Sequence, residues 1–419
     1  MHAWGTTSRM RRGSGGWARV ALAVLVLGWA VAGCRPAVAR LAARPAASAA
    51  GAGATATVGR PQPTATRTPT PRPSATPMPS PTPSPTATPE PHITLAFAGN
   101  IVPARCVQAA VDAGDITPDD LYAGVAGLLQ AADVAVGTLN AALSDYPPMR
   151  GCIKTFVLVG RSDQAAALAR AGFDGLSVAT NHIKNCGLLD CGDRAFFDTL
   201  QNLHAAGLWT VGAGPNLDAA LEPVVLDVRG VRFAFVSLGY IEPRAYAGPD
   251  TPGIAVLTPA NLQEAMRRAR AHRPDVLIAL PHWGPEYDPQ PTALQRDFAR
   301  QFVAAGATVV VGNHSHVVQG MEVLQGVPVF YSLGNFMFDQ DWSRETRQGV
   351  LLVLHFAGPR LVGWEFIPTV AAGNGVVQVA GPEDAAATLA RIWAASPRDL
   401  MPTPTLPPGW SLAPGAGSP

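Results

Sequence analysis

The sequence predicts an α/β fold in which a mainly parallel β-sheet is combined with a second, more antiparallel sheet, both lying between helical layers. Two observations support this class. From His92 onward, apolar strand-like runs alternate with helical stretches, which is typical of β-α units arranged around a parallel sheet. Nearer the C-terminal end, strand-like runs follow one another without intervening helices, which favours antiparallel pairing.

The individual elements follow from this alternation, in chain order. Strands are expected over the apolar, β-prone runs at residues 93–98, 134–136, 175–179, 208–211, 224–228, 231–238, 276–280, 308–311, 321–324, 327–332, 349–355 and 361–367. Helices are expected over residues 119–132, 164–171, 194–206, 261–271 and 293–304. Arg229-Gly230 separates two consecutive strand-like runs, which predicts a β-hairpin at this point.

The first 34 residues have the features of an export signal. Several arginines up to Arg19 precede an apolar run at residues 20–32, which has the length of a signal-peptide core and is too short for a comfortable membrane span. The run leads to Cys34 in the sequence VAGC, which matches a lipobox, where the cysteine is acylated and becomes the new N-terminus. We therefore predict an exported lipoprotein anchored through Cys34 to the outer face of the cell membrane. An ordinary signal peptide that contains a cysteine is the alternative.

Residues 35–91 and 401–419 are predicted to be disordered. Both segments are rich in proline, threonine and small residues and contain few large apolar side chains, so burial cannot offset the entropy of ordering them. Frequent proline in residues 60–91 favours an extended polyproline II chain, which would span on the order of 100 Å. Such a tether would hold the folded domain, expected over residues 92–400, away from the membrane.

The charge of the chain argues against a nucleic-acid partner. The 31 basic and 30 acidic residues leave a formal net charge of +1. A polyanion such as DNA is bound chiefly through an excess of basic residues, and the chain as a whole has almost none.

Beyond Cys34, the chain contains Cys106, Cys152, Cys186 and Cys191. An even number of cysteines in an exported domain favours disulfides. Three pairings are possible, and we predict Cys186–Cys191, which closes a short loop, together with Cys106–Cys152. A four-thiolate zinc site is the alternative, but no CxxC pair is present to support it.

Five polar segments each come directly after an apolar strand-like run. They are GNIVPAR from Gly99, GTLNAALS from Gly137, ATNHIKNCG from Ala179, PHWGPEY from Pro281 and GNHSH from Gly312. Ligands of α/β proteins collect at the carboxyl ends of strands, so we expect one shared polar site. Neutral imidazole is the commonest side-chain ligand of transition metals. A lone histidine is more often a hydrogen-bonded loop residue, but four histidines at three strand ends favour a common site.

These segments, together with YSLGNF at residues 331–336, resemble the CapA family of capsule or poly-γ-glutamate synthesis proteins, within the calcineurin-like metallophosphoesterase superfamily. The resemblance covers about residues 92–367. It is most specific in the combination of Asn181-His182 with HWGPEY and GNHSH. The resemblance implies a two-sheet α/β/β/α sandwich with a metallophosphoesterase-like site.

The resemblance also implies roles for individual residues. His182 falls where the superfamily has a general acid or a phosphate-contacting histidine, and Arg105 would contact an anionic group, so both are candidate catalytic residues. Glu286 and Asn335, with Arg105, are candidate substrate-binding residues. Residues 339–342, DQDW, form either the edge of the site or a solvated loop. The implied metal-ligand positions are Asn100, Asn140, Asn181, His282, His314 and His316.

Three carboxylates that the family usually has are replaced by asparagine in this chain. Asn100 stands in place of the Asp of Gly-Asp, Asn140 in place of the Glu of Asn-Leu-Glu, and Asn185 in place of an Asp. Two divalent ions about 3.5 Å apart repel by roughly 20 kcal/mol even at an effective dielectric of about 20, which bridging carboxylates normally offset. We therefore expect one divalent ion (Mn, Zn or Fe) or none, and reduced or lost hydrolase activity. Carboxylates that would compensate if loops bring them in are Glu286, Asp288, Asp339 and Asp341.

Three functions are compatible with this sequence. The first is an exported CapA-like protein in the biosynthesis or metabolism of a capsule or poly-γ-glutamate type polymer, acting on an anionic extracellular polymer or a phosphorylated glycan. The second is a non-catalytic surface lipoprotein that binds an anionic polymer or a partner. The third is an active metal-dependent phosphoesterase with rearranged ligands.

Overall fold

The computed structural model describes residues 90–146, 151–186, 192–397, 406 and 409–413. The predicted signal peptide with Cys34 and residues 35–89 of the predicted linker lie outside this part. All of the described residues belong to one compact unit, residues 84–419. Within the described ranges, the helices are all too short or too polar to cross a membrane.

The larger of the two main sheets is built around the first strand of the domain. Its strands are β1 (His92–Ile101), β2 (Val134–Leu139), β5 (Gly175–Ser177), β6 (Trp209–Val211), β16 (Asn335–Met337), β17 (Gln348–Ala357), β18 (Arg360–Ala371) and β19 (Val377–Val379). Their order is β19-β18-β17-β1-β2-β5-β6, with β16 paired to the end of β1. β1, β2, β5 and β6 are parallel, whereas β17, β18 and β19 extend the sheet antiparallel.

The second sheet contains the middle part of the chain. Its strands are β8 (Val224–Val228), β9 (Val231–Gly239), β11 (Val276–Trp283), β12 (Val309–Val311), β13 (Asn313–His314), β14 (Met321–Leu324) and β15 (Val327–Phe330). The order is β14-β15-β12-β11-β9-β8, with β13 paired to β11. The predicted hairpin is confirmed, since β8 and β9 pair antiparallel across Arg229 (φ 49°) and Gly230 (φ 83°).

The expectation that the late strands form a separate antiparallel sheet was wrong. β17 pairs with β1 over the register His92↔Ala357 to Phe97↔Leu352, so the C-terminal strands extend the first sheet. The physical reason is that β1 has a free edge on the side away from β2, and only the late strands are left to cover it. Two small pairs complete the strands: β3 (Ala142–Leu143) parallel with β4 (Val159–Gly160), and β7 (Ala213–Gly214) antiparallel with β10 (Gly253–Ile254).

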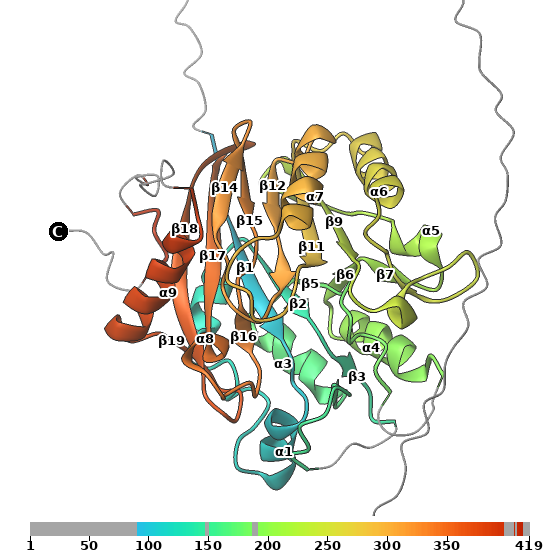
Figure 1. The fold of residues 1–419 in the computed structure, drawn as a ribbon, viewed down its shortest axis with the longest axis vertical. Coiled ribbons are helices and arrows are strands. Elements are labelled where there is room, and N and C mark those ends of the chain that lie inside the picture. The colour runs from blue at the N-terminus through green and yellow to red at the C-terminus, as the bar shows by residue number, and fades with distance from the viewer. Residues whose placement is uncertain (1–89, 147–150, 187–191, 398–405, 407–408, 414–419) are drawn as a thin grey trace, which may run out of the picture. The chain divides into compact units, whose positions relative to one another are not determined.

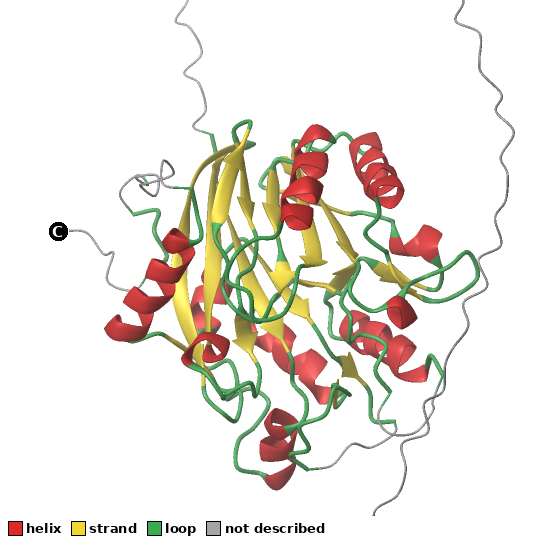
Figure 2. Cartoon of the chain, in the orientation of Figure 1, coloured by secondary structure: helices red, strands yellow, loops and turns green. Residues whose placement is uncertain are grey.

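The helices form the two outer layers (Figures 1 and 2). Those that pack on the first sheet are α1 (Cys106–Ala113), α2 (Ala126–Ala131), α3 (Asp163–Ala171) and α4 (Arg194–Ala205). Those that pack on the second sheet are α5 (Leu217–Ala220), α6 (Pro259–Ala271) and α7 (Ala293–Ala304). The remaining helical segments are the 3₁₀ turn η1 (Pro243–Ala245), α8 (Arg344–Arg347) and α9 (Pro382–Ala394), which packs on β17 and β18.

Alternation along β1 divides the core into layers. Leu95 and Phe97 point between the two sheets, where they join Phe235 and Ile278 of the second sheet in one buried cluster. Ala96 points to the opposite face and joins the cluster beneath α1 to α4. Successive side chains of a β-strand point to opposite faces of the sheet, so each face of β1 contributes to a different core. The arrangement is therefore α/β/β/α, as predicted.

The predicted helix over residues 119–132 is shorter in the structure. Only Ala126–Ala131 is helical, and the preceding residues form turns. Val377 of β19 donates its backbone N–H to the carbonyl of Leu121, and Tyr122 is buried in the core. These non-local contacts satisfy groups that a longer helix would have used internally.

Part of the segment expected to be an unstructured tail packs against β18. Trp410 stacks on His92 with ring centroids 3.7 Å apart. The carboxylate of Glu365 accepts backbone N–H groups from Leu412 at 2.9 Å and Ala413 at 3.1 Å. A nearly buried carboxylate needs such donors, which explains why this short stretch docks there.

Candidate functional site

The carboxyl ends of the central strands of both sheets meet at one place. β1 and β2 place Asn100 in register with Thr138, and β11 and β13 place His282 in register with Asn313. Asn140 directly follows β2. Parallel strands bring their ends to the same edge of a sheet. The polar residues predicted for the site are accordingly close to one another: Asn100, Asn140, Asn181, His182, His282, His314, His316 and Asn335.

A close backbone approach sets the spacing of these strand ends. A Cβ atom on Gly239 would lie 2.2 Å from the carbonyl oxygen of Ala179. Gly239 is in register with His282, and Ala179 precedes Asn181 by two residues. Only glycine permits this distance, so Gly239 helps to hold Asn181 and His282 within reach of each other.

Asn181, His282 and His314 form the innermost group. His282 Nε2 lies 2.9 Å from Asn181 Oδ1 and 3.1 Å from His314 Nδ1. Burial, together with the neighbouring histidines, holds the pKa of both imidazoles well below the ordinary value. They are therefore neutral at physiological pH, which is the state in which imidazole binds a metal ion.

A hydrogen-bonded chain holds His316 beside this group. His316 Nδ1 lies 2.8 Å from Asn335 Oδ1, and Asn335 Nδ2 donates to Gln340 Oε1 at 3.0 Å. Gln340 Nε2 in turn donates to the hydroxyl of Tyr287 at 3.1 Å. Burial lowers the pKa of His316 to about 4. The Asn335 oxygen therefore meets a neutral imidazole, and the predicted substrate-binding residue Asn335 serves here as a support for His316.

The hydrogen-bond partner of the His182 ring is the side-chain amide of Asn185. A carboxylate at this position would favour the protonated, charged imidazole. Asn185 Oδ1 accepts the backbone N–H of Leu158 at 2.8 Å and lies 2.7 Å from His182 Nδ1. An amide oxygen has only lone pairs to offer, so Nδ1 carries the proton and Nε2 is left unprotonated. Burial lowers the pKa of His182 to about 4. At neutral pH this imidazole can accept a proton but has none to donate as a general acid.

Arg105 is already paired with a carboxylate. Its Nε lies 3.1 and 3.2 Å from the two carboxylate oxygens of Asp339, its Nη2 also contacts this carboxylate, and its Nη1 donates to the carbonyl of Thr155 at 2.8 Å. Both side chains are almost fully buried. The guanidinium also lies 4.6 Å above the ring of Phe338. The resemblance implied that the positive charge of Arg105 would contact an anionic ligand. In the structure, Asp339 neutralises this charge.

The structure brings one of the four compensating carboxylates to the pocket. Asp339 pairs with Arg105, and Asp341 pairs with Lys154 at 2.6 Å. Asp288 accepts the backbone N–H of Gln290. Glu286 lines the pocket.

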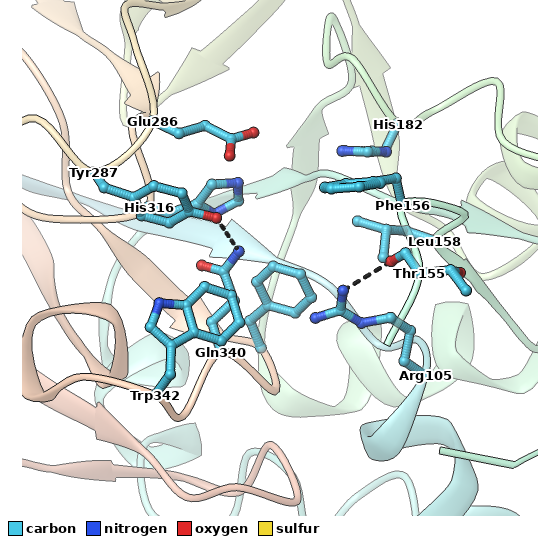
Figure 3. A pocket seen from close by; sticks show the side chains of 11 residues that line it. Arg105, Thr155, Phe156, Leu158, His182, Glu286, Tyr287, His316, Gln340 and Trp342 are labelled. Carbon is cyan, nitrogen blue, oxygen red and sulfur yellow. Dashed lines mark hydrogen bonds between the residues drawn. The ribbon is translucent and has the colours of Figure 1, made fainter. Parts of the chain in front are cut away.

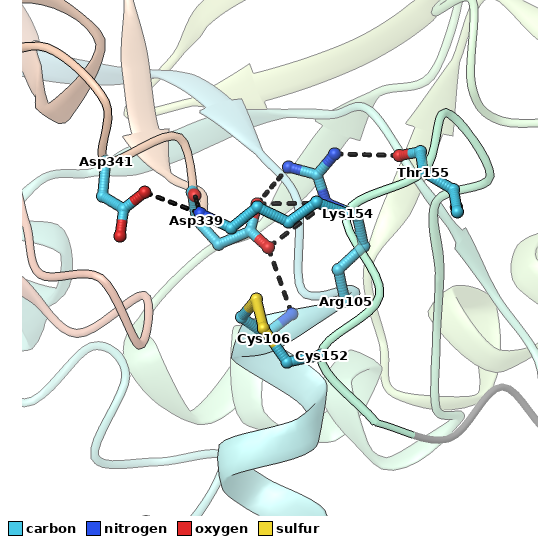
Figure 4. Close-up of a disulfide and its surroundings, with 7 residues drawn as sticks. All are labelled: Arg105, Cys106, Cys152, Lys154, Thr155, Asp339 and Asp341. Carbon is cyan, nitrogen blue, oxygen red and sulfur yellow. Dashed lines mark hydrogen bonds and ion pairs between the residues drawn. A yellow bond between two sulfur atoms is a disulfide. The ribbon is translucent and has the colours of Figure 1, made fainter. Parts of the chain in front are cut away.

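The predicted disulfide between Cys106 and Cys152 is present (Figure 4). It joins the first residue of α1 to the segment that carries Lys154 and Thr155, which both contact the Arg105–Asp339 pair. The bridge therefore supports one wall of the pocket. Cys186 is also disulfide-bonded, and its predicted partner Cys191 lies outside the described residues.

Backbone strain gathers at this site. Arg105 (φ 53°), Tyr287 (φ 62°), His314 (φ 106°) and His316 (φ 59°) all have positive φ. Such conformations are unfavourable for residues with a Cβ and persist where the surroundings impose them, often at functional sites.

Aromatic side chains form a large part of the pocket lining, and the position of one of them, Phe156, was not predicted. The pocket is lined by Arg105, Thr155, Phe156, Leu158, His182, Glu286, Tyr287, His316, Phe338, Gln340 and Trp342 (Figure 3). Tyr287 closes the motif HWGPEY, and Gln340 and Trp342 belong to DQDW, so two of the four residues 339–342 line the pocket. Phe156 carries no comparable signal, because its position depends on a loop that only the fold brings to the strand ends.

The donor set fits one metal ion better than two. In the described ranges, no three side chains of the types His, Cys, Asp and Glu are placed together to hold a metal ion. Asn181 Oδ1, His282 Nε2 and His314 Nδ1 converge, with distances of 2.9 and 3.1 Å from the His282 nitrogen, near the roughly 3.3 Å between ligand atoms of a tetrahedral zinc site. Asn100 Oδ1 and His282 Nδ1 are buried without a hydrogen-bond partner. No carboxylate of the described residues lies in this innermost group to bridge a second ion.

Comparison with known proteins gives consistent matches. A family described as "Bacterial capsule synthesis protein PGA_cap" matches residues 94–340. The PGA biosynthesis protein CapA of Bacillus subtilis (strain 168) is 30% identical over 265 residues, 63% of this chain and 67% of that protein. The capsule biosynthesis protein CapA of Bacillus anthracis is 31% identical over 271 residues, 63% of this chain and 64% of that protein. The chain therefore spans about two thirds of the length of these relatives.

Solved structures show more distant likenesses. A hypothetical protein from Thermus thermophilus has a TM-score of 0.42 and 13% identity, covering 66% of this chain and 98% of that one. A 5'-nucleotidase precursor from the same organism has a TM-score of 0.41 and 15% identity, covering 73% of this chain and 58% of that one.

Proposed function

Because the chain belongs to the family of bacterial capsule synthesis proteins, PGA_cap, we propose that it acts in the biosynthesis or metabolism of an extracellular polymer of capsule or poly-γ-glutamate type. The polymer would be anionic, either poly-γ-glutamate or a phosphorylated glycan. The match over residues 94–340 includes every strand-end motif of the site, which supports a role for this pocket in handling the polymer.

One observation carries the proposal for the chemistry of the site, namely that its histidine and asparagine side chains are neutral. A pair of divalent ions requires anionic ligands to offset the repulsion between them, and amides stand at the three positions where the family usually has carboxylates. One divalent ion held by Asn181, His282 and His314 would polarise a phosphoryl or carboxylate oxygen. The neutral groups are His182, His282, His314, His316, Asn100, Asn140 and Asn185.

The proton state of His182 favours binding over hydrolysis. Its Nδ1 proton is directed to Asn185, so the free Nε2 can accept a hydrogen bond from a ligand in the pocket. With a pKa of about 4, it has no proton to give a leaving group at neutral pH. We therefore propose a polymer-handling protein with strongly reduced turnover. A non-catalytic surface lipoprotein shares these features, whereas a phosphoesterase with rearranged ligands would have to recruit Glu286.

We also propose that the protein is exported and held at the outer face of the cell membrane through lipid on Cys34. The lipobox sequence VAGC and the proline-rich residues 35–91 support this. Metabolic labelling with a fatty acid should mark the full chain and not a Cys34→Ala variant. Equal labelling of both would contradict the anchor.

Elemental analysis of the purified protein tests the proposed site. After dialysis against Mn²⁺, Zn²⁺ or Fe²⁺, we expect one ion or less per chain, and two in the triple variant Asn100→Asp, Asn140→Glu, Asn185→Asp. Two ions per unmodified chain, together with phosphoesterase turnover, would contradict the proposal that the site holds one ion or less and has strongly reduced turnover. In cells, deletion of the gene should reduce the extracellular polymer, and unchanged polymer would contradict the role in its biosynthesis.

A further inference from the structure

Three exposed aromatic side chains surround the mouth of the pocket. Phe156 is 85% exposed, Trp342 55% and Tyr287 43%, and all three line the pocket. Figure 3 shows Tyr287 and Trp342 on one side and Phe156 across from them. Single exposed apolar residues are common, but several gathered at one opening mark a binding surface.

The charges at this opening do not suit a polyanion. Among the residues that line the pocket, Arg105 is the cation, and the buried Asp339 neutralises it. Lys154, which lies beside this pair, is bound to Asp341. The carboxylate of Glu286 faces the pocket. At this opening, a chain with one carboxylate per unit, such as poly-γ-glutamate, would meet this like charge, and the lining residues offer no unpaired cationic side chain to offset it.

Two polar groups that remain for a ligand, on Glu286 and His182, are hydrogen-bond acceptors. The Glu286 carboxylate offers only lone pairs, and Nδ1 of His182 lies 2.7 Å from the Asn185 amide oxygen, which leaves Nε2 of this imidazole as an acceptor. A matching ligand must therefore supply donors. Hydroxyl groups supply them without adding charge.

A groove continues from the pocket along the same aromatic side chains. It is lined by Val317, Ser343, Thr346 and others, and it shares Tyr287 and Trp342 with the pocket. Arg391, the cation among the described residues that line the groove, contacts Glu345 at 3.4 Å. Trp342 thus stands between two adjoining hollows, which suits a ligand made of consecutive units.

We propose that the pocket and groove bind uncharged sugar units of a glycan chain, with Trp342 between two consecutive units. A sugar ring presents an apolar C–H face, which packs on aromatic rings, and a rim of hydroxyl groups, which donate to Glu286 and His182. The inference rests on the proposed function and commits to its glycan alternative, in which the sugar units that occupy the pocket and groove carry no charge and any phosphate lies on other units of the chain. Poly-γ-glutamate lacks both the apolar ring face and the hydroxyl rim.

An array of bacterial capsule and cell-wall oligosaccharides, printed beside a γ-linked glutamate hexamer, tests the proposal with the full-length protein. The unmodified chain should bind at least one oligosaccharide and not the glutamate hexamer. Trp342→Ala and Phe156→Ala should weaken that binding by roughly tenfold or more, the scale of an aromatic hot spot, while Trp342→Phe retains most of it. Phe197→Ala is the matched control, because Phe197 is also exposed but does not line the pocket.

Three results would overturn the proposal. They are binding of the glutamate hexamer in preference to every oligosaccharide, no binding of any oligosaccharide, and oligosaccharide binding that Trp342→Ala and Phe156→Ala leave unchanged. Thermal unfolding of each variant shows that lost binding does not come from lost folding. Failure of the proposed function and failure of the inferred ligand class can be told apart. An unchanged amount of extracellular polymer after gene deletion contradicts the proposed function, whereas the array result concerns the ligand class alone.

Discussion

The two ends of β1 lie beside buried histidines that have different partners. At its start, His92 stacks on His355, whose Nε2 lies 2.5 Å from the carboxylate of Glu365. At its end, His316 lies 2.8 Å from the amide oxygen of Asn335, and nearby His182 has the same kind of partner in Asn185.

The partner decides whether a buried group carries charge. Burial by itself would raise the pKa of Glu365, but hydrogen bonds from His355, Ser411 and two backbone N–H groups lower it overall. An amide offers no charge, so burial dominates and lowers the pKa of His182 and His316 to about 4. One end of the sheet is thus a self-contained polar cluster, whereas the other presents neutral groups that a ligand can use.

The largest effect that we expect is an acid-induced loss of stability at the site end. His182 and His316 have a pKa of about 4 in the folded protein against an ordinary value of 6.5, so the unfolded chain binds these protons first. Stability is therefore full above pH 6.5 and is lost as the pH falls from 6.5 towards 4. At about 1.4 kcal/mol per pKa unit, we expect a loss of about 3 kcal/mol for each of these two histidines, or about 6 kcal/mol together, over this window. Urea denaturation of the metal-free protein measures it.

His316→Gln is the informative variant for this acid response. It removes one of the four histidines of the site whose pKa is lowered, so the stability of the variant should fall less steeply between pH 6.5 and 4. The four are His182, His282, His314 and His316. The same slope in the variant and the unmodified chain would show that other groups cause the acid lability.

Removal of the carboxylate at the opposite end should have the next largest effect. Glu365→Gln leaves His355, Ser411 and the backbone donors of residues 412 and 413 without their charged partner. We expect a loss of about 3 kcal/mol in the free energy of unfolding. Glu383→Gln serves as the control, because the Glu383 side chain is 89% exposed and its loss should change little. Equal values for both variants would show that the Glu365 cluster does not stabilise the fold.

Gly239→Ala tests how tightly the strand ends of the site are spaced. The added Cβ would lie 2.2 Å from the carbonyl oxygen of Ala179, so strands must move apart, with a loss of about 2 kcal/mol. Gly127→Ala provides the matched control, since no atom lies within 4 Å of a Cβ at that position in α2. Thermal unfolding of both variants measures the difference. Similar melting temperatures would mean that the strands can move apart at Gly239 without a loss of stability.

The smallest effect concerns the protonation of a single imidazole. Asn185→Asp gives His182 the kind of partner that Glu365 gives His355, so the pKa of His182 should rise by about 1 to 2 units. NMR titration of the His182 ring resonances measures this shift. An unchanged value would mean that burial alone controls the pKa of His182, whatever its partner.

The sequence by itself determined the layers of this domain and the strand ends at which its polar residues gather. From His92 onward, apolar strand-like runs alternate with helical stretches, and polar segments follow several of the strands. These patterns are local, so they can be recognised without knowing how the strands are arranged. The Cys106–Cys152 bridge and the hairpin at Arg229-Gly230 were likewise predicted and are present. Strand ends that are polar in sequence meet in space because parallel strands share their direction.

Only the tertiary structure decided how the site is charged and what lines it. Arg105 and Asp339 are 234 residues apart in the chain, so their pairing, which removes the free cation, has no local signal. β17 joins the first sheet because β1 offers an open edge, and Phe156 and Trp342 reach the same opening from two separate loops. Such contacts depend on how distant segments of the chain pack together, because charge pairing and burial depend on proximity in space and not on order along the chain.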